Sequence, residues 1–402
     1  MESPLDLLTE AEHLQDRTVD LRRRIHRRPE LGLQLPETQA AILAEIDDLD
    51  LDVRTGTSVT SVVAVLEGAH PGPTYLLRGD MDALPLSEDT GLDFSSEVPG
   101  AMHACGHDTH VAMLASAARL LASRRDDIAG RVLFMFQPGE EGFHGARFML
   151  EEGLLTTVAE APVSGAFALH TISTYASGTV HTRGGPFLAS EDRIVITVSG
   201  GGGHASAPHQ AQDPIPAACE IVLALQTMVT RRVDVFDPAV ITIATVSAGT
   251  ADNIIPPTAT LGGTMRTLSA NTRSVVRDHV RRIAEDIASA HGLTAEVDLI
   301  AGFPVTVNDA EVAATARTVA QNLLGAERVP PMDFPTMGAE DWSYVLEKVP
   351  GAMAFLGACP PGLKPDDAPA NHSNLVVFDE AALPTGVALY CAMALDALSP
   401  TG

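Results

Sequence analysis

Side chains that bind metal ions are concentrated in four short motifs of this sequence. The motifs are MHACGHDTH at 102–110, FQPGEEG at 136–142, ALH at 168–170 and NHS at 371–373. They offer a thiol, imidazoles and one carboxylate of an adjacent pair, on Cys105, His107, Glu140 or Glu141, His170 and His372. A single tetrahedral zinc ion needs only four ligands, so this surplus of donors predicts a site for two metal ions.

The spacing inside the motifs restricts how the chain presents these groups. Cys105 and His107 are two residues apart. A helix would separate them by about 200° around its axis, whereas a strand or loop can direct both toward one site. Glu140 and Glu141 are adjacent, so a regular element sends one carboxylate to the site and the other past it. One Glu can then bind metal while its neighbour acts as a base toward an attacking water.

Each motif also has a purely structural interpretation. A Cys-Gly-His triplet is common in proteins, a buried Cys often acts as a small hydrophobe, and an acidic pair suits the surface of an acidic chain. We favour a metal site because several imidazoles, a thiol and Asp108 fall within one nine-residue motif. A core would have to satisfy each of these polar groups separately. The sequence assigns no role to His103 or His110.

Two further carboxylates, Asp80 and Asp82, end an apolar run in LRGDMDALP at 77–85. A solvated turn also explains them, since Asp is an ordinary loop residue. The functional alternative is support of the ligands. A carboxylate that accepts the distal N–H of a ligating His fixes its tautomer and raises its basicity. We expect this role for Asp82, with Asp80 as a second supporting carboxylate.

Composition narrows the class of protein. The chain has 402 residues, which favours two domains, and 26 basic against 52 acidic residues. Its formal net charge of −26 argues against nucleic acid or an anionic membrane surface as a partner. Four irregularly spaced cysteines do not form the disulfide pattern of a small secreted domain. With no apolar run long enough to span a membrane and no signal-like start, we expect a cytoplasmic protein.

The first half of the chain alternates apolar runs with helical patterns. Residues 5–27 have the pattern of an amphipathic helix, and helical patterns recur at 103–124 and 144–153. Short apolar runs that end in Gly, Pro or charge predict strands at 61–68, 73–85, 131–139 and 164–170. This alternation predicts an α/β domain, a sheet with helices on both faces. The candidate ligands then lie just past strand ends, where open sheets bind ligands.

The pattern changes near residue 190. Strands are predicted at 192–200, 239–249, 259–269 and 294–302, and helices at 213–232 and 271–292. The order β-α-β-β-α-β is that of a ferredoxin-like unit. We expect this unit, at 189–304, to be inserted between the two parts of a larger domain, at 1–188 and 305–402.

Three polar residues of the inserted unit are further candidates for the site. His204 lies in the glycine-rich GGGGHASAPH at 200–209, which lacks the ending of a phosphate-binding loop. It is either a turn residue or a group that covers the reacting carbonyl. Asn253 and Arg266 are either polar residues of a turn and a strand or a grip on a substrate carboxylate, for which Arg has the bidentate geometry.

Taken together, the motifs resemble those of the M20 metallopeptidase family, in its amidohydrolase branch. That branch includes hippurate hydrolases, auxin-conjugate hydrolases and N-acyl-amino-acid deacylases. The resemblance runs nearly end to end. It rests on HRRPELG at 26–32, LRGDMDALP, MHACGHDTH, FQPGEEG, the GGHASAPH and DPI region, DNIIP, MGAEDWSY at 337–344, and His372.

The resemblance implies a dinuclear catalytic domain and a lid domain that pairs with its copy in a homodimer or higher homo-oligomer. By this comparison Cys105 is the thiolate shared by both metals. The remaining ligands and the general base are assigned in the same way, as His107, Glu141, His170 and His372 for the ligands and Glu140 for the base. His204 would stabilise the oxyanion, in some arrangements from the partner subunit, with Asn253 and Arg266 nearby. Two divalent ions per subunit are implied, with Zn, Mn, Co and Ni as candidates.

The sequence departs from the family pattern in two places. Residues 168–178, ALHTISTYASG, lack the Trp-Pro often found after the ligand His, and NHSNLVVFDE at 371–380 differs from the usual Pro and aromatic residues. Both changes bear on the acyl pocket and therefore on substrate choice.

These observations lead to one main hypothesis and several alternatives. The main hypothesis is hydrolysis of the amide bond of N-acyl-L-amino acids, with acetyl, benzoyl or aryl-acyl groups as candidates. The first alternative is a small-peptide or N-acetyl-diaminopimelate-type deacylase of the same family. A second is a metal-binding or sensing protein without catalysis. A third, Cys105 as a papain-like nucleophile, needs one His and an Asn or Asp rather than four further ligands.

Overall fold

The computed structural model describes residues 4–156 and 161–399 and divides into two compact units. The larger unit contains residues up to Phe187, Val307–Phe334 and the chain from Asp341 onward. The smaller unit contains Leu188–Thr306 together with Pro335–Glu340. The short segment Pro335–Glu340, which the sequence analysis assigns to the larger domain, therefore has its contacts in the smaller unit.

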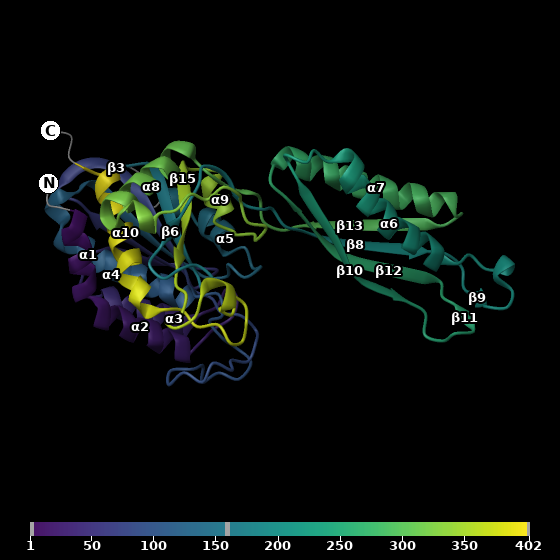
Figure 1. The fold of residues 1–402 in the computed structure, drawn as a ribbon, viewed down its shortest axis with the longest axis horizontal. Helices are drawn as coiled ribbons and strands as arrows, with labels where there is room; N and C mark the ends of the chain where they lie inside the picture. Colours follow the sequence, from purple (N-terminus) through teal and green to yellow (C-terminus); the bar gives the residue numbers. More distant parts are fainter. Residues whose placement is uncertain (1–3, 157–160, 400–402) are drawn as a thin grey trace. The chain divides into compact units, whose positions relative to one another are not determined.

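A seven-stranded mixed sheet forms the centre of the larger unit, in the order β1-β2-β4-β3-β5-β15-β6 (Figure 1). Four neighbouring strands, β4, β3, β5 and β15, are parallel, and the strands beyond them are antiparallel. The strands are β1 (Asp52–Thr55), β2 (Val62–Glu67), β3 (His70–Asp80), β4 (Ala129–Gln137), β5 (Val163–Ile172), β6 (Val180–His181) and β15 (Gly351–Gly357). A separate two-stranded pair joins β7 (Gly185–Leu188) to β14 (Thr306–Asn308).

Helices cover this sheet. The helices of the larger unit are α1 (Pro4–His13), α2 (Gln15–Arg27), α3 (Pro36–Ile46), α4 (His107–Ser123), α5 (Gly145–Glu151), α8 (Ala310–Leu324), α9 (Ser343–Leu346) and α10 (Leu383–Ala397). α4 and α10 pack on each other and on the central strands β3 and β5, while α5 contacts β4 and α9. Every residue of β15 is buried, which is typical of a parallel strand covered on both faces. The predicted α/β class, with a mixed sheet and helices on its faces, is confirmed.

The first helical segment differs from the prediction. The pattern over 5–27 predicts one helix, but the chain forms α1 and α2 with a break at Leu14, whose N–H bonds the carbonyl of Ala11. Hydrophobic periodicity continues across this break because both helices turn an apolar face to the same core. Periodicity alone therefore does not detect the break.

The smaller unit is a four-stranded antiparallel sheet in the order β10-β12-β8-β13, with α6 and α7 on one face (Figure 1). Its elements are β8 (Asp192–Ser199), α6 (Pro214–Arg232), β10 (Ala239–Ala248), β12 (Thr258–Thr267), α7 (Ala270–Ala290) and β13 (Thr294–Ala301). This is the β-α-β-β-α-β order. Alternate residues of β8, namely Ile194, Ile196 and Val198, are buried under the helices, as period-two patterning requires. A short ribbon of β9 (Gly203–His204) and β11 (Ile254–Ile255) extends from the sheet.

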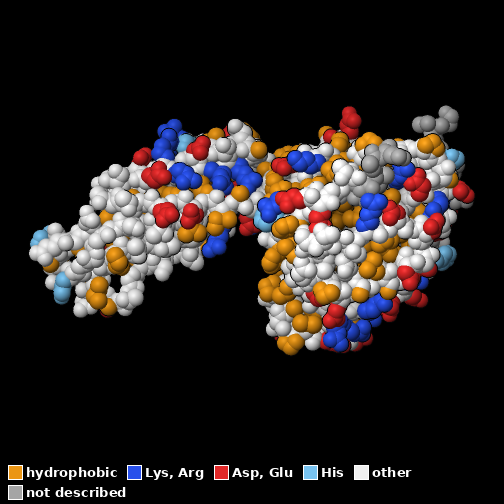
Figure 2. Space-filling view, turned by 180° about the vertical axis from the view of Figure 1, so that it is seen from behind, with side chains coloured by type: hydrophobic (Ala, Val, Ile, Leu, Met, Phe, Trp, Pro, Cys, Tyr) orange, Lys and Arg blue, Asp and Glu red, His pale blue; other side chains and the backbone are white. Residues whose placement is uncertain are grey.

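The surface of the larger unit carries mixed charge. On the face seen in Figure 2, its Lys and Arg side chains are interspersed with Asp and Glu. Among the helices of the described residues, none is both long and apolar enough to cross a membrane.

Candidate metal centre

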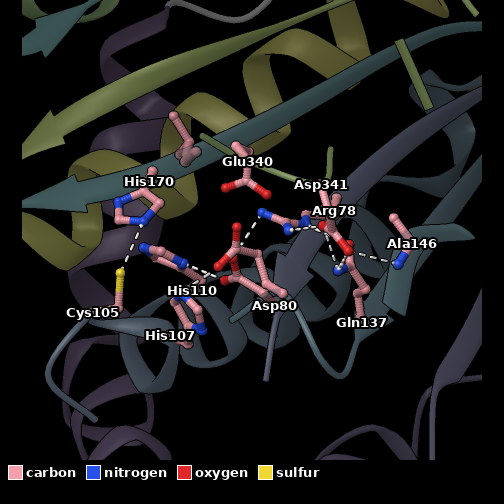
Figure 3. Close-up of polar contacts among 12 residues, drawn as sticks. Arg78, Asp80, Cys105, His107, His110, Gln137, Ala146, His170, Glu340 and Asp341 are labelled. Atoms are coloured by element: carbon pink, nitrogen blue, oxygen red, sulfur yellow. Dashed lines mark hydrogen bonds and ion pairs between the residues drawn. The ribbon is translucent and has the colours of Figure 1, made fainter. Parts of the chain in front are cut away.

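The predicted ligands of the larger unit come together at one edge of its sheet. Because β3, β4, β5 and β15 are parallel, the segments that follow them meet at the same edge. His170 lies near the end of β5, and the Glu pair follows β4. Cys105 precedes α4 and His107 is its first residue, so the loop-to-helix junction presents both side chains together. Figure 3 shows the Cys105 sulfur directed at the His170 ring.

Five groups of side chains among the described residues have the geometry of metal-ligand sets, and Cys105 belongs to two of them. In the first, one ligand atom each of Cys105, His107 and His170 lies within 4.8 Å of the others, and in the second the same holds for Cys105, Glu141 and His372. The Cys105 Sγ is 3.4 Å from His170 Nε2 and 3.2 Å from His372 Nε2. This overlap is the arrangement that a thiolate shared by two ions needs.

The backbone determines which nitrogen of each imidazole is free. His107 Nδ1 donates to the carbonyl of Asp82 at 2.8 Å, and His170 Nδ1 donates to the carbonyl of Thr171 at 2.9 Å. A carbonyl can only accept, so in the neutral rings the lone pair is on Nε2. These are the atoms that face Cys105 and Glu141.

Asp82 supports the site differently from the expectation. Its backbone carbonyl, rather than its carboxylate, makes the short hydrogen bond to His107, and the carboxylate Oδ1 is 3.5 Å from the same nitrogen. The carboxylate instead accepts the backbone N–H of Glu140 and of Glu141, each at 2.9 Å. Asp82 therefore fixes the loop that carries the acidic pair, in addition to orienting His107.

The two carboxylates of the acidic pair lie in overlapping groups of candidate ligands. Glu141 belongs to the ligand set of Cys105 and His372, with its Oε1 3.5 Å from His372 Nε2. The buried Glu140 has a carboxylate oxygen within 4.8 Å of His107 and Glu141 ligand atoms. Gly139 and Gly142 flank the pair with φ values of 70° and 85°, in the left-handed region that favours glycine. This tight turn is what presents both carboxylates at the strand end.

The charged forms of these buried acidic groups need a nearby positive charge to stabilise them. Burial raises the pKa of Glu141 to about 7 and also raises the pKa of the Cys105 thiol, where the Glu141 charge adds to the effect. Burial acts to lower the pKa of His107, but the charges of Asp80 and Cys105 outweigh it and raise that pKa well above 6.5. Burial lowers the pKa of His170 and of His372, which favours the neutral imidazole that a metal ligand requires.

Two polar atoms in the site lack a hydrogen-bond partner among the described residues. These are His107 Nε2 and Glu141 Oε1, both buried and 3.9 Å apart. Buried polar atoms are nearly always satisfied, and binding of an ion is one of the few explanations for exceptions. Thiolate, imidazole and carboxylate together suit zinc and related late first-row ions. The donor set and its unsatisfied atoms thus fit divalent cations.

A buried ionic network lies beneath the ligands, and the sequence analysis missed most of it (Figure 3). Arg78 binds the Asp80 carboxylate at 2.8 Å, Asp341 at 3.2 Å and the Gln137 amide oxygen at 2.9 Å. Burial raises the pKa of Asp80, but Arg78, His107 and His110 together lower it well below its usual value. The sequence does contain a signal, since the charged residue Arg78 directly follows the apolar residues Leu76 and Leu77 within β3.

His110 joins this network as a structural residue. Its Nε2 accepts the backbone N–H of Thr171 at 2.8 Å, and its Nδ1 donates to Asp80. With both nitrogens engaged, His110 offers no lone pair to an ion, although it lies near His107 and Asp80. His103 is buried, has no hydrogen-bond partner among the described residues, and has its pKa lowered to about 3 by burial.

The three candidates of the smaller unit lie at two different ends of its sheet. His204 and Asn253 are together on the β9–β11 ribbon, where the Ala205 N–H donates to the Asn253 carbonyl. Arg266 is near the far end of β12, where its guanidinium donates to the Met337 carbonyl at 2.9 Å and lies 3.4 Å from Glu191. The structure brings His204 and Asn253 together but does not bring Arg266 to them.

Comparison with known proteins identifies the family. The profile of Peptidase family M20/M25/M40 matches residues 76–396. The chain is 38% identical to thermostable carboxypeptidase 1 of Saccharolobus solfataricus, over 97% of each chain. It is 39% identical to an N-acetylcysteine deacetylase of Bacillus subtilis, over 85% of this chain and 88% of that protein. The chain therefore belongs to the M20 peptidase family and is a metal-dependent hydrolase of that class.

A solved structure agrees with this assignment. The YxeP protein of Bacillus subtilis, described as a dinuclear metal binding peptidase of the M20 family, aligns with a TM-score of 0.82 and 33% identity. The alignment covers 96% of this chain and 99% of that chain. The likeness in fold therefore extends over nearly the whole length of this chain.

Proposed function

We propose that this protein hydrolyses the amide bond of N-acyl-L-amino acids, releasing a carboxylate and a free amino acid. The observation that carries the proposal is the pair of ligand sets sharing Cys105, with the buried Glu140 carboxylate beside them. Two ions with a further carboxylate beside them are the components that hydrolysis of an unactivated amide needs.

In this proposal the ligands are Cys105, His107, Glu141, His170 and His372. Divalent ions bound by them would acidify water and polarise the substrate carbonyl. Glu140, held by the Asp82 carboxylate through its backbone N–H, takes the proton from the attacking water. It then delivers this proton to the nitrogen of the leaving amino acid, so one carboxyl group acts first as base and then as acid.

His204 is suited to stabilise the oxyanion. Its Nδ1 accepts the backbone N–H of Ser206 at 3.1 Å, so the neutral ring carries its proton on Nε2. The side chain is exposed, which leaves this N–H available to a substrate oxygen. A donor of this kind is worth most when it meets the charge that develops during attack.

We propose that His204 acts on the site of a partner copy. Thr258 and Arg266 are separated by eight residues of β12, roughly 25 Å at the rise of a strand. His204 lies beyond the Thr258 end, so one copy of this unit cannot bring both His204 and Arg266 to one small substrate. Two copies can, with Arg266 from one chain and His204 from the other.

An edge strand supports the same dimer. β10 is at the edge of the sheet, contains ten residues without charge or proline, and exposes Val240 and Val246. The opposite edge, β13, carries Glu296 and Asp298. Uncharged edges invite strand pairing and charged ones prevent it, so we propose that β10 is the dimerisation edge.

The names of relatives support the substrate class. Deacetylation of N-acetylcysteine and carboxypeptidase action both cleave an amide beside a free carboxylate. They differ in what lies on the other side of the amide, an acyl group or an amino acid. A small-peptide carboxypeptidase is therefore the second candidate function, favoured by the identity to the Saccharolobus solfataricus enzyme.

The test is release of free amino acid from acetyl- and benzoyl-amino acids, measured against dipeptides with the same C-terminal residue. The proposal expects hydrolysis of the acyl substrates, abolished by a chelator and restored by Zn, Mn, Co or Ni. Faster cleavage of dipeptides would favour the peptidase instead. Full activity in the chelator would contradict both, and no activity on any substrate with ions bound would favour a sensor.

A further inference from the structure

The segment that carries His372 is the least regular of those that carry the proposed ligands. Cys105 and His107 are at the start of α4, and His170 is within β5. Residues 368–379, in contrast, contain no helix or strand. The His372 side chain is 55% exposed, and its backbone φ of 71° is uncommon outside glycine. Contacts other than regular secondary structure must therefore hold this ligand in place.

The preceding residue, Asn371, supplies these contacts. Its Nδ2 donates to the Cys105 carbonyl at 3.0 Å and to the Thr171 carbonyl at 2.9 Å. Its Oδ1 accepts the backbone N–H of Ser173 at 3.1 Å and the Ser173 hydroxyl at 3.2 Å. One side chain thus connects the segments of Cys105, His170 and His372. The His372 N–H adds a bond to the Ala104 carbonyl at 2.8 Å.

These contacts require a side-chain amide at position 371. The Asn side chain has two N–H donors and two acceptor lone pairs, and Asn371 donates both N–H groups and accepts the Ser173 N–H. The Ser173 hydroxyl shares its one proton between Asn371 Oδ1 and the Pro369 carbonyl, which is closer at 2.7 Å. Aspartate has the same shape but cannot donate, so it would place a carboxylate oxygen against two carbonyls. The bond to Thr171 also shares its acceptor with His170 Nδ1, so Asn371 and the imidazole are held by the same carbonyl.

We propose that Asn371 is a positioning residue that holds the two ligand sets at fixed positions relative to each other. It belongs to neither ligand set, and acts by fixing the Cys105 and His170 segments relative to His372. This inference rests on the proposed function, because it assumes that ions bind to these ligands. Groups that orient metal ligands typically contribute about 10- to 100-fold to metal affinity.

The test compares two isosteric substitutions in the same unit. Asn308 is the matched control, because its amide donates to the Arg183 and Met353 carbonyls at 2.9 Å and accepts the Met353 N–H at 2.8 Å. It is 1% exposed and belongs to neither ligand set. N371D, N308D and wild-type protein are stripped of metal, melted to measure stability, and titrated with Zn²⁺ against a chromogenic chelator.

We expect N371D to bind Zn²⁺ about 10- to 100-fold more weakly than wild type, with its activity recovering as the metal concentration rises. N308D should lose stability but keep wild-type Zn²⁺ affinity. N371S, which keeps one donor, should fall between N371D and wild type, and it carries the test if N371D does not fold. Unchanged affinity in the folded Asn371 variants, or an equal loss in N308D, would overturn the inference. A wild-type chain that binds no ion would overturn the proposed function as well.

Discussion

The two units of the chain differ in how many charged side chains they bury and in how these are paired. In the larger unit, Arg78, Asp80 and Asp341 are fully buried and form a network under the ligand sets. In the described stretch Leu188–Thr306, Asp192 is the buried charged residue, and two partly exposed arginines bind it, Arg273 and Arg277. The core of that unit is otherwise made of apolar side chains packed between helices and sheet.

This difference matches two different tasks. Metal ligands must be held in one geometry within a region of low dielectric constant, where a buried ionic network orients them at a cost in desolvation. In the smaller unit, two of the three candidate groups, His204 and Asn253, are on an exposed ribbon that extends from an apolar scaffold. The predictions that follow test this division, beginning with the largest effect.

Glu140→Gln should leave metal binding intact and lower kcat by about 10²- to 10⁴-fold, because the amide cannot take a proton from water. Metal content and turnover of the same preparation provide the measurement. Glu141→Gln is the matched control, since it removes a proposed ligand and should lose bound metal. A Glu140→Gln variant with near wild-type kcat would show that another group is the base.

His204→Ala should lower kcat by about 10²- to 10³-fold without affecting metal content, because an oxyanion donor is removed from outside the ligand sets. Mixing the His204→Ala and Glu140→Gln variants shows whether His204 acts on the site of its own chain or on that of the partner chain. If His204 acts on the partner's site, half of the dimers are mixed and each has one intact site, so about a quarter of wild-type activity returns. No recovery on mixing dimers that exchange chains would place His204 in its own chain's site.

Arg78→Met should destabilise the metal-free protein by about 3–5 kcal/mol, because it leaves two buried carboxylates without their counter-charge. Arg273→Met should cost about 1 kcal/mol or less, since this arginine is partly exposed and Arg277 still binds Asp192. Urea denaturation of the two variants gives the comparison. Equal losses would contradict the proposed difference between the units.

The smallest effect concerns pH. Burial acts to raise the pKa of Glu88, but hydrogen bonds from His26, Thr90 and the Ser96 N–H outweigh it and lower the pKa from 4.5 to about 2. A depressed pKa stabilises the folded state above pH 4.5, and this contribution is lost as the pH falls toward 2. The stability advantage of wild type over Glu88→Gln should therefore shrink across that range. An advantage that stays constant from pH 5 to about 2.5 would contradict the assigned contacts.

Much of the fold follows from local patterns in the sequence. The strand predicted at 192–200 and the helix predicted at 213–232 correspond to β8 and α6. Both predictions rest on the periodicity of apolar side chains along consecutive residues, which is a local signal. The order of strands in the larger sheet cannot be predicted from such local patterns. Nothing local indicates that β15, from the last part of the chain, pairs with β5 and β6, since this depends on long-range packing.

The sequence also predicts part of the candidate site. Residue types and spacing single out Cys105 and the acidic pair, and the structure brings them together. The supporting groups were harder to identify because they act through backbone atoms. Asp82 presents its carbonyl to His107, and Asn371 binds carbonyls of distant segments, contacts that no side-chain motif encodes.

The central claim is that Cys105 is shared by two ion sites, and metal stoichiometry tests it most directly. Elemental analysis and Zn²⁺ titration would be applied to wild type, Cys105→Ser, His170→Ala and His372→Ala. The account predicts two ions per chain in wild type, one tight ion in each His variant, and the loss of both tight sites in Cys105→Ser. A Cys105→Ser variant that still binds two ions with wild-type affinity would contradict it.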